Sequence, residues 1–210
     1  MAQHDHLRAP DRAFTSVQRR IEMMNDAPST PDPGGVPKDP FDLLGLEPHF
    51  DLDLEKMRTR VRRRMAACHP DLCIDPMQMA EATQLSARLN EARDLLEDDE
   101  RRANLLHARL GGPTAQMDGS LPPDFLMEIL DIRMRLEDAI ETRDHVQSNE
   151  LKIWAMAERA RLKSEVASGL ERMAEGEDLG TSVRGHLNIW RYIERMLSQL
   201  EPMTGDGVAG

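Results

Sequence analysis

The chain has 210 residues, of which 40 % are hydrophobic and 31 % charged, enough apolar material for one domain or two small ones. Aromatic residues make up only 3 % while methionine occurs 14 times, so we expect helices with aliphatic cores in which methionine fills gaps. A net charge of −11 argues against general coating of nucleic acid, and two cysteines are too few for a disulfide scaffold. No apolar run approaches the roughly 18 residues of a membrane span, and we find no signal-peptide type of segment, so we expect a cytoplasmic protein.

Residues 1–38 are expected to form a flexible N-terminal extension. Apolar side chains recur at helical spacing over residues 11–24, which predicts a short helix there. Residues 25–38 contain four prolines and two glycines, a composition typical of a linker. Nothing in this region indicates a chemical function.

Two helices are predicted at the start of the first folded domain, which we place at residues 39–112. Asp39 before Pro40 is a typical helix start, and Gly45 is expected to end this short helix. A second helix is expected to begin at Asp51 or Asp53. Its apolar residues form one narrow stripe with steps of three, four, four and three: Leu54, Met57, Val61, Met65 and Cys68.

Two further helices complete this domain. Asp75 and Pro76 again give a cap followed by proline, and the stripe of the third helix is Ala82, Leu85, Leu89, Ala92 and Leu96. Because a short loop joins the second and third helices, we expect them to form an antiparallel hairpin. A short fourth helix, capped by Asp98 or Asp99, is expected to end at the Gly-Gly-Pro of residues 111–113.

The remainder of the chain predicts a second helical domain. Residues 113–122 read as a linker, 123–202 as a three-helix bundle and 203–210 as a tail. Short connections favour an up-down-up arrangement, and no segment shows the alternation of a strand. The predicted fold class is therefore all-α, a helical hairpin with short flanking helices followed by a three-helix bundle.

The tripeptide His69-Pro70-Asp71 stands at the bend of the predicted hairpin. One interpretation is a turn in which proline stops the helix and aspartate binds its own backbone. However, six of the nine residues from Lys56 to Arg64 are Lys or Arg, and no acidic residue lies among them. A rigid polar tip beside a basic helix suits docking on a partner that carries a negative patch.

Other functions for this corner receive less support from the sequence. A nucleic-acid role would need aromatic stacking residues, which are absent nearby. Zinc would need four ligands, whereas Cys68, His69 and Cys73 have no second Cys or His pair at a matching spacing. We expect neither a metal nor a cofactor. No phosphate-binding or catalytic motif occurs, so nothing in the sequence suggests an enzyme.

The first helix of the predicted bundle has more apolar surface than one core contact needs. Its core stripe is Phe125, Ile129, Ile132, Leu136 and Ala139, and beside it lie Leu126, Met127, Leu130 and Met134. Either this helix is wedged between two neighbours, or the second set is an exposed protein-binding patch. On the last helix Val183, Leu187, Trp190, Leu197 and Leu200 can serve the core, which leaves Ile189, Tyr192 and Met196 on an adjoining side.

Together these motifs resemble a known family of co-chaperones. Residues 40–110, with PFDLLGL, a basic helix, HPD and ARLNEARDLLEDDERRANLL, resemble a J-domain. Residues 121–200, with DFLMEILDIRMRLEDA and WRYIERMLSQLE, resemble the C-terminal bundle of HscB, the J-type co-chaperone of iron–sulfur cluster assembly. The resemblance implies an adaptor between a DnaK-type or HscA chaperone and the cluster scaffold protein IscU, with no membrane or nucleic-acid partner.

The resemblance also implies roles for individual residues. His69, Pro70 and Asp71 would stimulate the ATPase of the chaperone, and basic residues of the preceding helix would dock on it: Arg58, Arg62 and Arg63. The scaffold would bind at Leu126, Met127, Leu130, Asp131, Met134 and Tyr192. Cys68 departs from the aromatic residue that the family usually has before HPD, and Met134 replaces an acidic residue that is frequent there. The alternative is a general J-protein whose bundle binds a different client.

Overall fold

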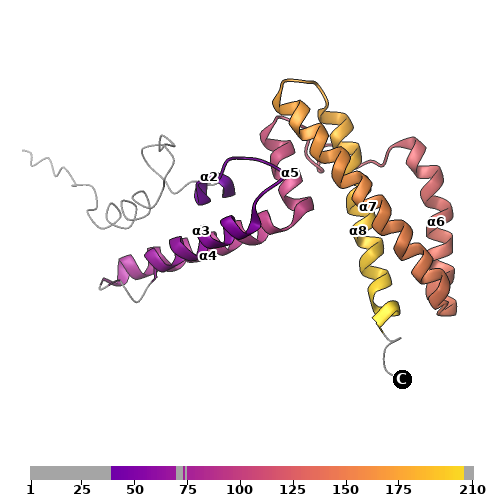
Figure 1. The fold of residues 1–210 in the computed structure, drawn as a ribbon, viewed down its shortest axis with the longest axis horizontal. Coiled ribbons are helices and arrows are strands. Elements are labelled where there is room, and N and C mark those ends of the chain that lie inside the picture. The colour runs from indigo at the N-terminus through magenta and orange to yellow at the C-terminus, as the bar shows by residue number, and fades with distance from the viewer. Residues whose placement is uncertain (1–38, 70–72, 74, 206–210) are drawn as a thin grey trace, which may run out of the picture. The chain divides into compact units, whose positions relative to one another are not determined.

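The computed structural model describes residues 39–69, 73 and 75–205. All the regular secondary structure in these residues is helical, which confirms the predicted all-α fold (Figure 1). These helices form two compact units, which divide between Asp98 and Asp99. The helix expected at residues 11–24 and the tail at 206–210 lie outside the described residues.

The first unit begins with two helices whose starts are capped as the sequence predicts. In α2 (Pro40–Leu44) the Asp39 carboxylate accepts a hydrogen bond from the Phe41 amide at 2.8 Å. Gly45 ends α2 with φ 62°, a left-handed conformation that costs glycine little. In α3 (Leu54–Ala67) the cap is Asp53, which accepts from the Lys56 amide at 2.9 Å.

The long helix α4 (Pro76–Glu97) packs beside α3 as the predicted hairpin, and α2 covers them (Figure 1). All five predicted stripe residues of α4 are buried, as are Met57, Val61 and Cys68 of α3. The core of this unit therefore forms where the two stripes meet. Its apolar character is aliphatic, apart from Phe41 and Phe50.

The boundary between the units differs from our expectation at residue 112. Helix α5 (Asp99–Arg109) packs against α7 (His145–Ala174) and α8 (Gly180–Gly205), so it belongs to the second unit. Polar contacts hold it there: Glu100 accepts from Arg191 Nε at 3.0 Å, and Asn104 accepts from Arg184 Nη1 at 2.8 Å. These long-range pairs cannot be read from local spacing.

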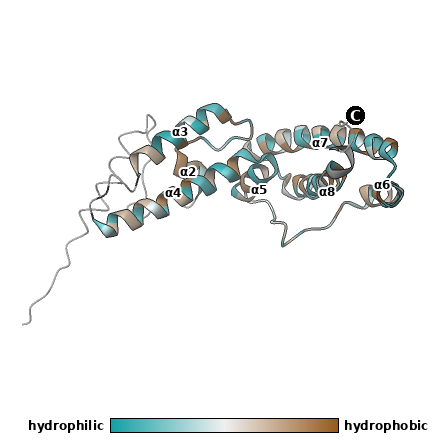
Figure 2. Cartoon of the chain, turned by 90° about the horizontal axis from the view of Figure 1, so that it is seen from below, coloured by the Kyte–Doolittle hydropathy of each residue, from teal (hydrophilic) through white to brown (hydrophobic). Residues whose placement is uncertain are grey.

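The three predicted bundle helices are α6 (Pro123–Thr142), α7 and α8 (Figure 1). Each carries both hydrophobic and hydrophilic residues, as Figure 2 shows. α6 packs against α7 and buries its whole predicted core stripe. Asp144 caps α7 by accepting from the amides of Val146 and Gln147 at 2.9 and 3.0 Å.

The last helix, α8, buries two apolar stripes rather than one. Besides its predicted core residues, Ile189 and Met196 are 5 % and 2 % exposed, so their placement on a surface side was wrong. Tyr192 lies on the same face of α8, one turn from each of them, and packs on Phe125 of α6, so this face of α8 is turned toward α6 inside the bundle. Of this set only Tyr192 is half-buried.

Candidate functional site

The HPD segment begins where α3 ends. Cys68 caps the helix and is 2 % exposed, whereas the next residue, His69, is exposed. The Cys68 sulfur lies 3.7 Å from the Ser86 hydroxyl, and burial raises the pKa of this thiol. Cys68 therefore acts as a core residue that anchors the start of the bend. Pro70 and Asp71 lie outside the described residues.

Two of the arginines of α3 hold the first unit together. Arg64 is 7 % exposed and donates to the Leu43 carbonyl at 2.7 Å. Arg60 donates to the carbonyl of Gly45. Both carbonyls belong to the end of α2, where the last turn of a helix lacks intrahelical partners. The sequence shows these arginines only as part of a charged run, because their acceptors are known only once α2 and α3 are packed.

The three arginines predicted to dock a chaperone differ in their surroundings. Arg58 forms ion pairs with Glu55 at 3.0 Å and with Glu97 at 2.6 Å, and hydrogen bonding to Glu97 raises its pKa. Arg62 is exposed and donates to the Thr59 hydroxyl at 2.9 Å. Arg63 is exposed and contacts no carboxylate among the described residues. Of these three arginines, Arg62 and Arg63 therefore carry the positive charge that is available to a partner.

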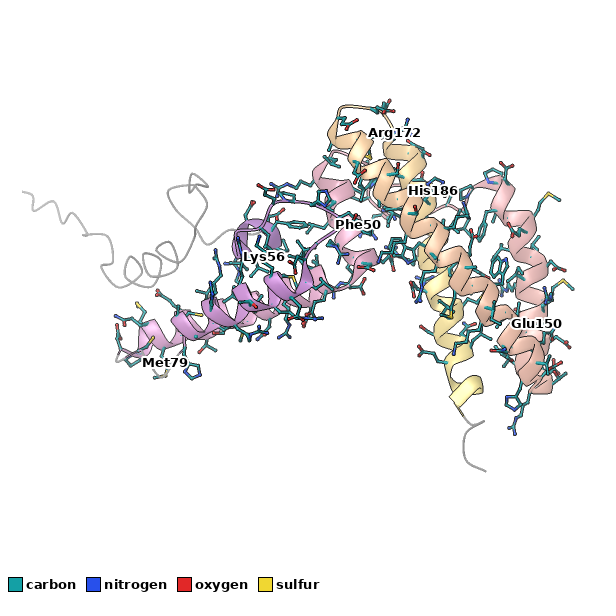
Figure 3. All side chains as sticks on the ribbon, in the orientation of Figure 1. Phe50, Lys56, Met79, Glu150, Arg172 and His186 are labelled. Atoms are coloured by element: carbon teal, nitrogen blue, oxygen red, sulfur yellow. The ribbon has the colours of Figure 1, made fainter. Side chains whose placement is uncertain are left out.

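The far end of the hairpin also exposes methionine. Met77 and Met79, in the first turn of α4, are 58 % and 45 % exposed, and Figure 3 places Met79 at the end of the hairpin away from α2. We did not predict them as site residues, although both fall outside the α4 core stripe. Among the described residues, no group of three or more His, Cys, Asp or Glu could hold a metal ion.

The second set of apolar residues on α6 forms an exposed patch, which we call the α6 patch: Leu126, Met127, Leu130 and Met134. Their side chains are 44 %, 81 %, 62 % and 70 % exposed. The sequence left two interpretations open for α6, a helix between two neighbours or a helix with an exposed apolar surface. The exposed surface is confirmed. Asp131 is also exposed.

Tyr192 borders the same side of the bundle. Its ring packs edge to face on Phe125, with centroids 6.3 Å apart and an interplanar angle of 79°. Arg133 lies near Tyr192 on this edge, and its Nε donates to the Glu137 carboxylate at 2.9 Å, a hydrogen bond that raises the pKa of Arg133. Sequence reasoning missed Arg133, whose place became evident only from the position of α8.

Together these residues form a surface suited to binding a protein. Unpaired apolar side chains on an exposed helix face gain by leaving water when a partner covers them. The aromatic edge at Tyr192 and the ion pair at its side give this surface a polar border. None of the helices in the described part of the chain has the length and apolar character needed to cross a membrane.

Comparison with known proteins extends this description. Residues 121–201 match the family model of the HSCB C-terminal oligomerisation domain. The co-chaperone protein HscB homolog of Bordetella petrii is 28 % identical over 165 residues, which cover 77 % of this chain and 94 % of the relative. The homolog of Paraburkholderia xenovorans is 28 % identical over 164 residues, 77 % of this chain and 93 % of that protein.

Two solved structures share the fold. Chaperone HscB from Vibrio cholerae has a TM-score of 0.63 at 23 % identity, over 78 % of this chain and 96 % of its own. The human co-chaperone protein HscB has a TM-score of 0.69 at 21 % identity, over 96 % of this chain and 91 % of its own. The two structures show the shared fold, and the family model and the two homologs support the resemblance to HscB-type co-chaperones that the sequence motifs indicated.

Proposed function

We propose that this chain stimulates the ATPase of a DnaK-type or HscA-type chaperone and delivers an iron–sulfur scaffold protein of the IscU type to it. The observation that carries the proposal is the exposed α6 patch, which lies inside the segment that matches the HSCB domain. The patch has no core function of its own, since the adjacent stripe of α6 already packs the bundle.

The scaffold would cover the α6 patch and contact its borders. Leu126, Met127, Leu130 and Met134 supply the apolar centre, with Asp131 and Tyr192 beside them. Methionine adapts its shape to an uneven partner surface, and tyrosine combines an apolar ring with a polar end. Such a centre with a polar border is the usual composition of a protein interface.

Chaperone docking would use the other unit. Arg62 and Arg63 offer exposed charge, and His69 is exposed at the end of the same helix. Arg58 would contribute only by exchanging its ion pairs with Glu55 and Glu97 for a partner's carboxylates. We therefore assign the main electrostatic attraction to Arg62 and Arg63, and the stimulation of hydrolysis to His69, Pro70 and Asp71.

In this proposal the chain performs no chemistry and couples two binding events. Tethering raises the concentration of scaffold near the chaperone. The HPD segment favours the nucleotide state that holds the scaffold tightly, and by linkage scaffold and chaperone favour each other's binding. Both parts of the chain are needed on one molecule.

The proposal is tested by titrating a DnaK-type or HscA-type ATPase with this chain, with and without an IscU-type scaffold. We expect stimulation by the chain alone and a further increase when the scaffold is added. His69→Gln should abolish stimulation while leaving scaffold binding unchanged. Stimulation that survives His69→Gln would contradict the assigned role of the HPD segment.

The scaffold site is tested separately with Leu126→Ala, Met127→Ala and Leu130→Ala combined. We expect scaffold affinity to fall by at least a hundredfold, because three central contacts are removed, while stimulation without scaffold persists. Ile153→Ala on α7 is a matched control, since Ile153 is 61 % exposed and lies outside the patch. If the scaffold never binds but another protein is held at the patch, the chain is a J-protein with a different client.

A further inference from the structure

Oxidisable side chains occupy the most exposed places of the α6 patch. Met127 is 81 % exposed and Met134 is 70 % exposed, whereas Met57 and Met196 in the cores are 0 % and 2 % exposed. Oxidation of methionine depends on access of the oxidant to the thioether sulfur. A mild oxidant would therefore reach the α6 patch well before it reached either core.

The two sulfurs lie on one face of one helix. Met127 and Met134 are seven residues apart, which is about two helical turns or roughly 10 Å along α6. Leu130 lies between them on this face, with Asp131 beside it. Sulfur-bearing side chains project from α6 on the side away from α7 in Figure 3. One partner surface would thus cover both methionines at once.

We propose that Met127 and Met134 are reversible oxidation sites through which peroxide lowers the affinity of the free chain for the scaffold. The inference rests on the proposed scaffold-binding function of the α6 patch. In the reaction a lone pair of the thioether sulfur attacks one oxygen of hydrogen peroxide and the O–O bond breaks. A sulfur–oxygen bond forms, water leaves, and sulfur is oxidised by two electrons as the peroxide is reduced.

The sulfoxide changes the physical character of the patch. A flexible apolar side chain gains a strongly polar oxygen, which must lose its water when the scaffold covers it. Burying such a group without a hydrogen-bond donor weakens binding by about tenfold for each sulfoxide. Leu126 and Leu130, in the same patch, have no group that reacts in this way. The response is therefore confined to the two methionines.

The change is also chemically reversible. A methionine sulfoxide reductase transfers the oxygen away at the cost of two thiols, which form a disulfide while water is released. The thioether and the apolar patch are restored together. The α6 patch therefore acts as a surface whose affinity for the scaffold falls under peroxide and recovers under thiol-dependent repair.

The experiment uses the full chain, hydrogen peroxide and an IscU-type scaffold. Sulfoxides are located by peptide mass spectrometry, and the scaffold Kd is measured by calorimetry before oxidation, after it, and after reductase treatment. We expect both methionines to gain one oxygen, the Kd to rise about a hundredfold, and repair to restore it. For Met127→Leu/Met134→Leu, the Kd after oxidation divided by the Kd before oxidation should stay near one, whatever the starting affinity of this variant.

Met117→Leu is the matched control, because Met117 is 78 % exposed but lies outside α6. On oxidation, the scaffold Kd of this control should rise by the same factor as that of the unchanged chain. If the double variant loses as much affinity on oxidation as the unchanged chain, or if both sulfoxides form without changing the Kd, the inference is wrong although the proposed function stands. If the untreated chain does not bind the scaffold, the proposed function fails and the inference falls with it.

Discussion

Gly169 of α7 faces Val183 of α8 so closely that a Cβ atom at residue 169 would lie 2.5 Å from Val183 Cγ2. Val183 is 2 % exposed, so its side chain has little space to move aside. Glycine is here a packing requirement, since it allows the two longest helices of the bundle to approach closely. This contact brings together α8, which carries Tyr192, and the rest of the bundle.

Replacing Gly169 by alanine should lower the free energy of unfolding by up to about 2 kcal/mol. The overpacking penalty of about 1–3 kcal/mol exceeds the gain of about 1 kcal/mol in helix propensity. In Gly169→Ala/Val183→Ala the new methyl group fills the space that the valine leaves, so we expect favourable coupling of about 1 kcal/mol in a double-mutant cycle measured by urea unfolding. Additive effects would show that the two side chains do not share this space.

Stability should decrease as the pH falls below about 6.5, the ordinary pKa of histidine, partly because of His107. Its Nε2 lies 2.7 Å from the Gly180 carbonyl and must donate, and its buried Nδ1 has no partner among the described residues. Burial lowers the pKa of His107, and the charge of Arg184 acts in the same direction. The unfolded chain therefore takes up this proton first, so folding is penalised progressively between the unfolded and the folded pKa.

The measurement is urea unfolding at a series of pH values from about 7.5 to 5 for the unchanged chain and for His107→Gln. Glutamine can still donate to the carbonyl but does not titrate. The unchanged chain should lose more stability than the variant over this range. Equal losses would mean that His107 contributes nothing to the acid sensitivity.

Reversing the charges of Arg62 and Arg63 to glutamate should raise the concentration of chain needed for half-maximal ATPase stimulation by about tenfold or more. Both side chains are exposed, so the melting temperature should change little. Added salt should weaken stimulation by the unchanged chain, because exposed charges are screened over about 10 Å at 0.1 M. Similar stimulation by both proteins at low salt would assign docking to other residues.

Arg64→Ala provides the contrast on the same helix. It removes the donor to the Leu43 carbonyl and leaves a gap under α2, so unfolding should become easier by about 2 kcal/mol. Circular dichroism during urea unfolding measures this effect. Unaltered stability would show that water or another donor replaces the guanidinium.

Tyr192 should contribute to scaffold binding mainly through its ring. Tyr192→Phe retains the edge-to-face contact with Phe125, so we expect less than about a threefold change in scaffold Kd. Tyr192→Ala removes the ring and should weaken binding about tenfold. If the phenylalanine variant bound as weakly as the alanine variant, the hydroxyl would be the principal contact.

The sequence predicted well those features that depend on near neighbours along the chain. Asp39 and Asp75 each cap a helix that starts with proline, because a carboxylate reaches amides only two or three residues away. The stripes of α4 and α6 were also predicted fully, since helical period places their members on one face. The exposure of the α6 patch is confirmed, whereas the roles of His69, Arg62 and Arg63 stay predictions.

What the sequence could not predict depends on packing between distant segments. Arg58 pairs with Glu97 across 39 residues, so its charge is already engaged in the folded chain. Ile189 and Met196 are buried on the face of α8 where Tyr192 packs on Phe125 of α6, and the spacing along one helix does not show which of its faces another helix covers. Both differences arise from tertiary contacts that spacing along one helix does not encode.

The attachment of α5 to the bundle decides how this chain can be dissected. A fragment that ended after Gly112 would retain α5 but lack α7 and α8, leaving Ala103 and Leu106 open to water and His107 without the Gly180 carbonyl. Such a fragment would expose an apolar face of α5 that is buried in the intact molecule. Self-association of the fragment would therefore be an artefact of the truncation. Division of the chain between Asp98 and Asp99 would instead keep α5 together with α7 and α8, against which it packs.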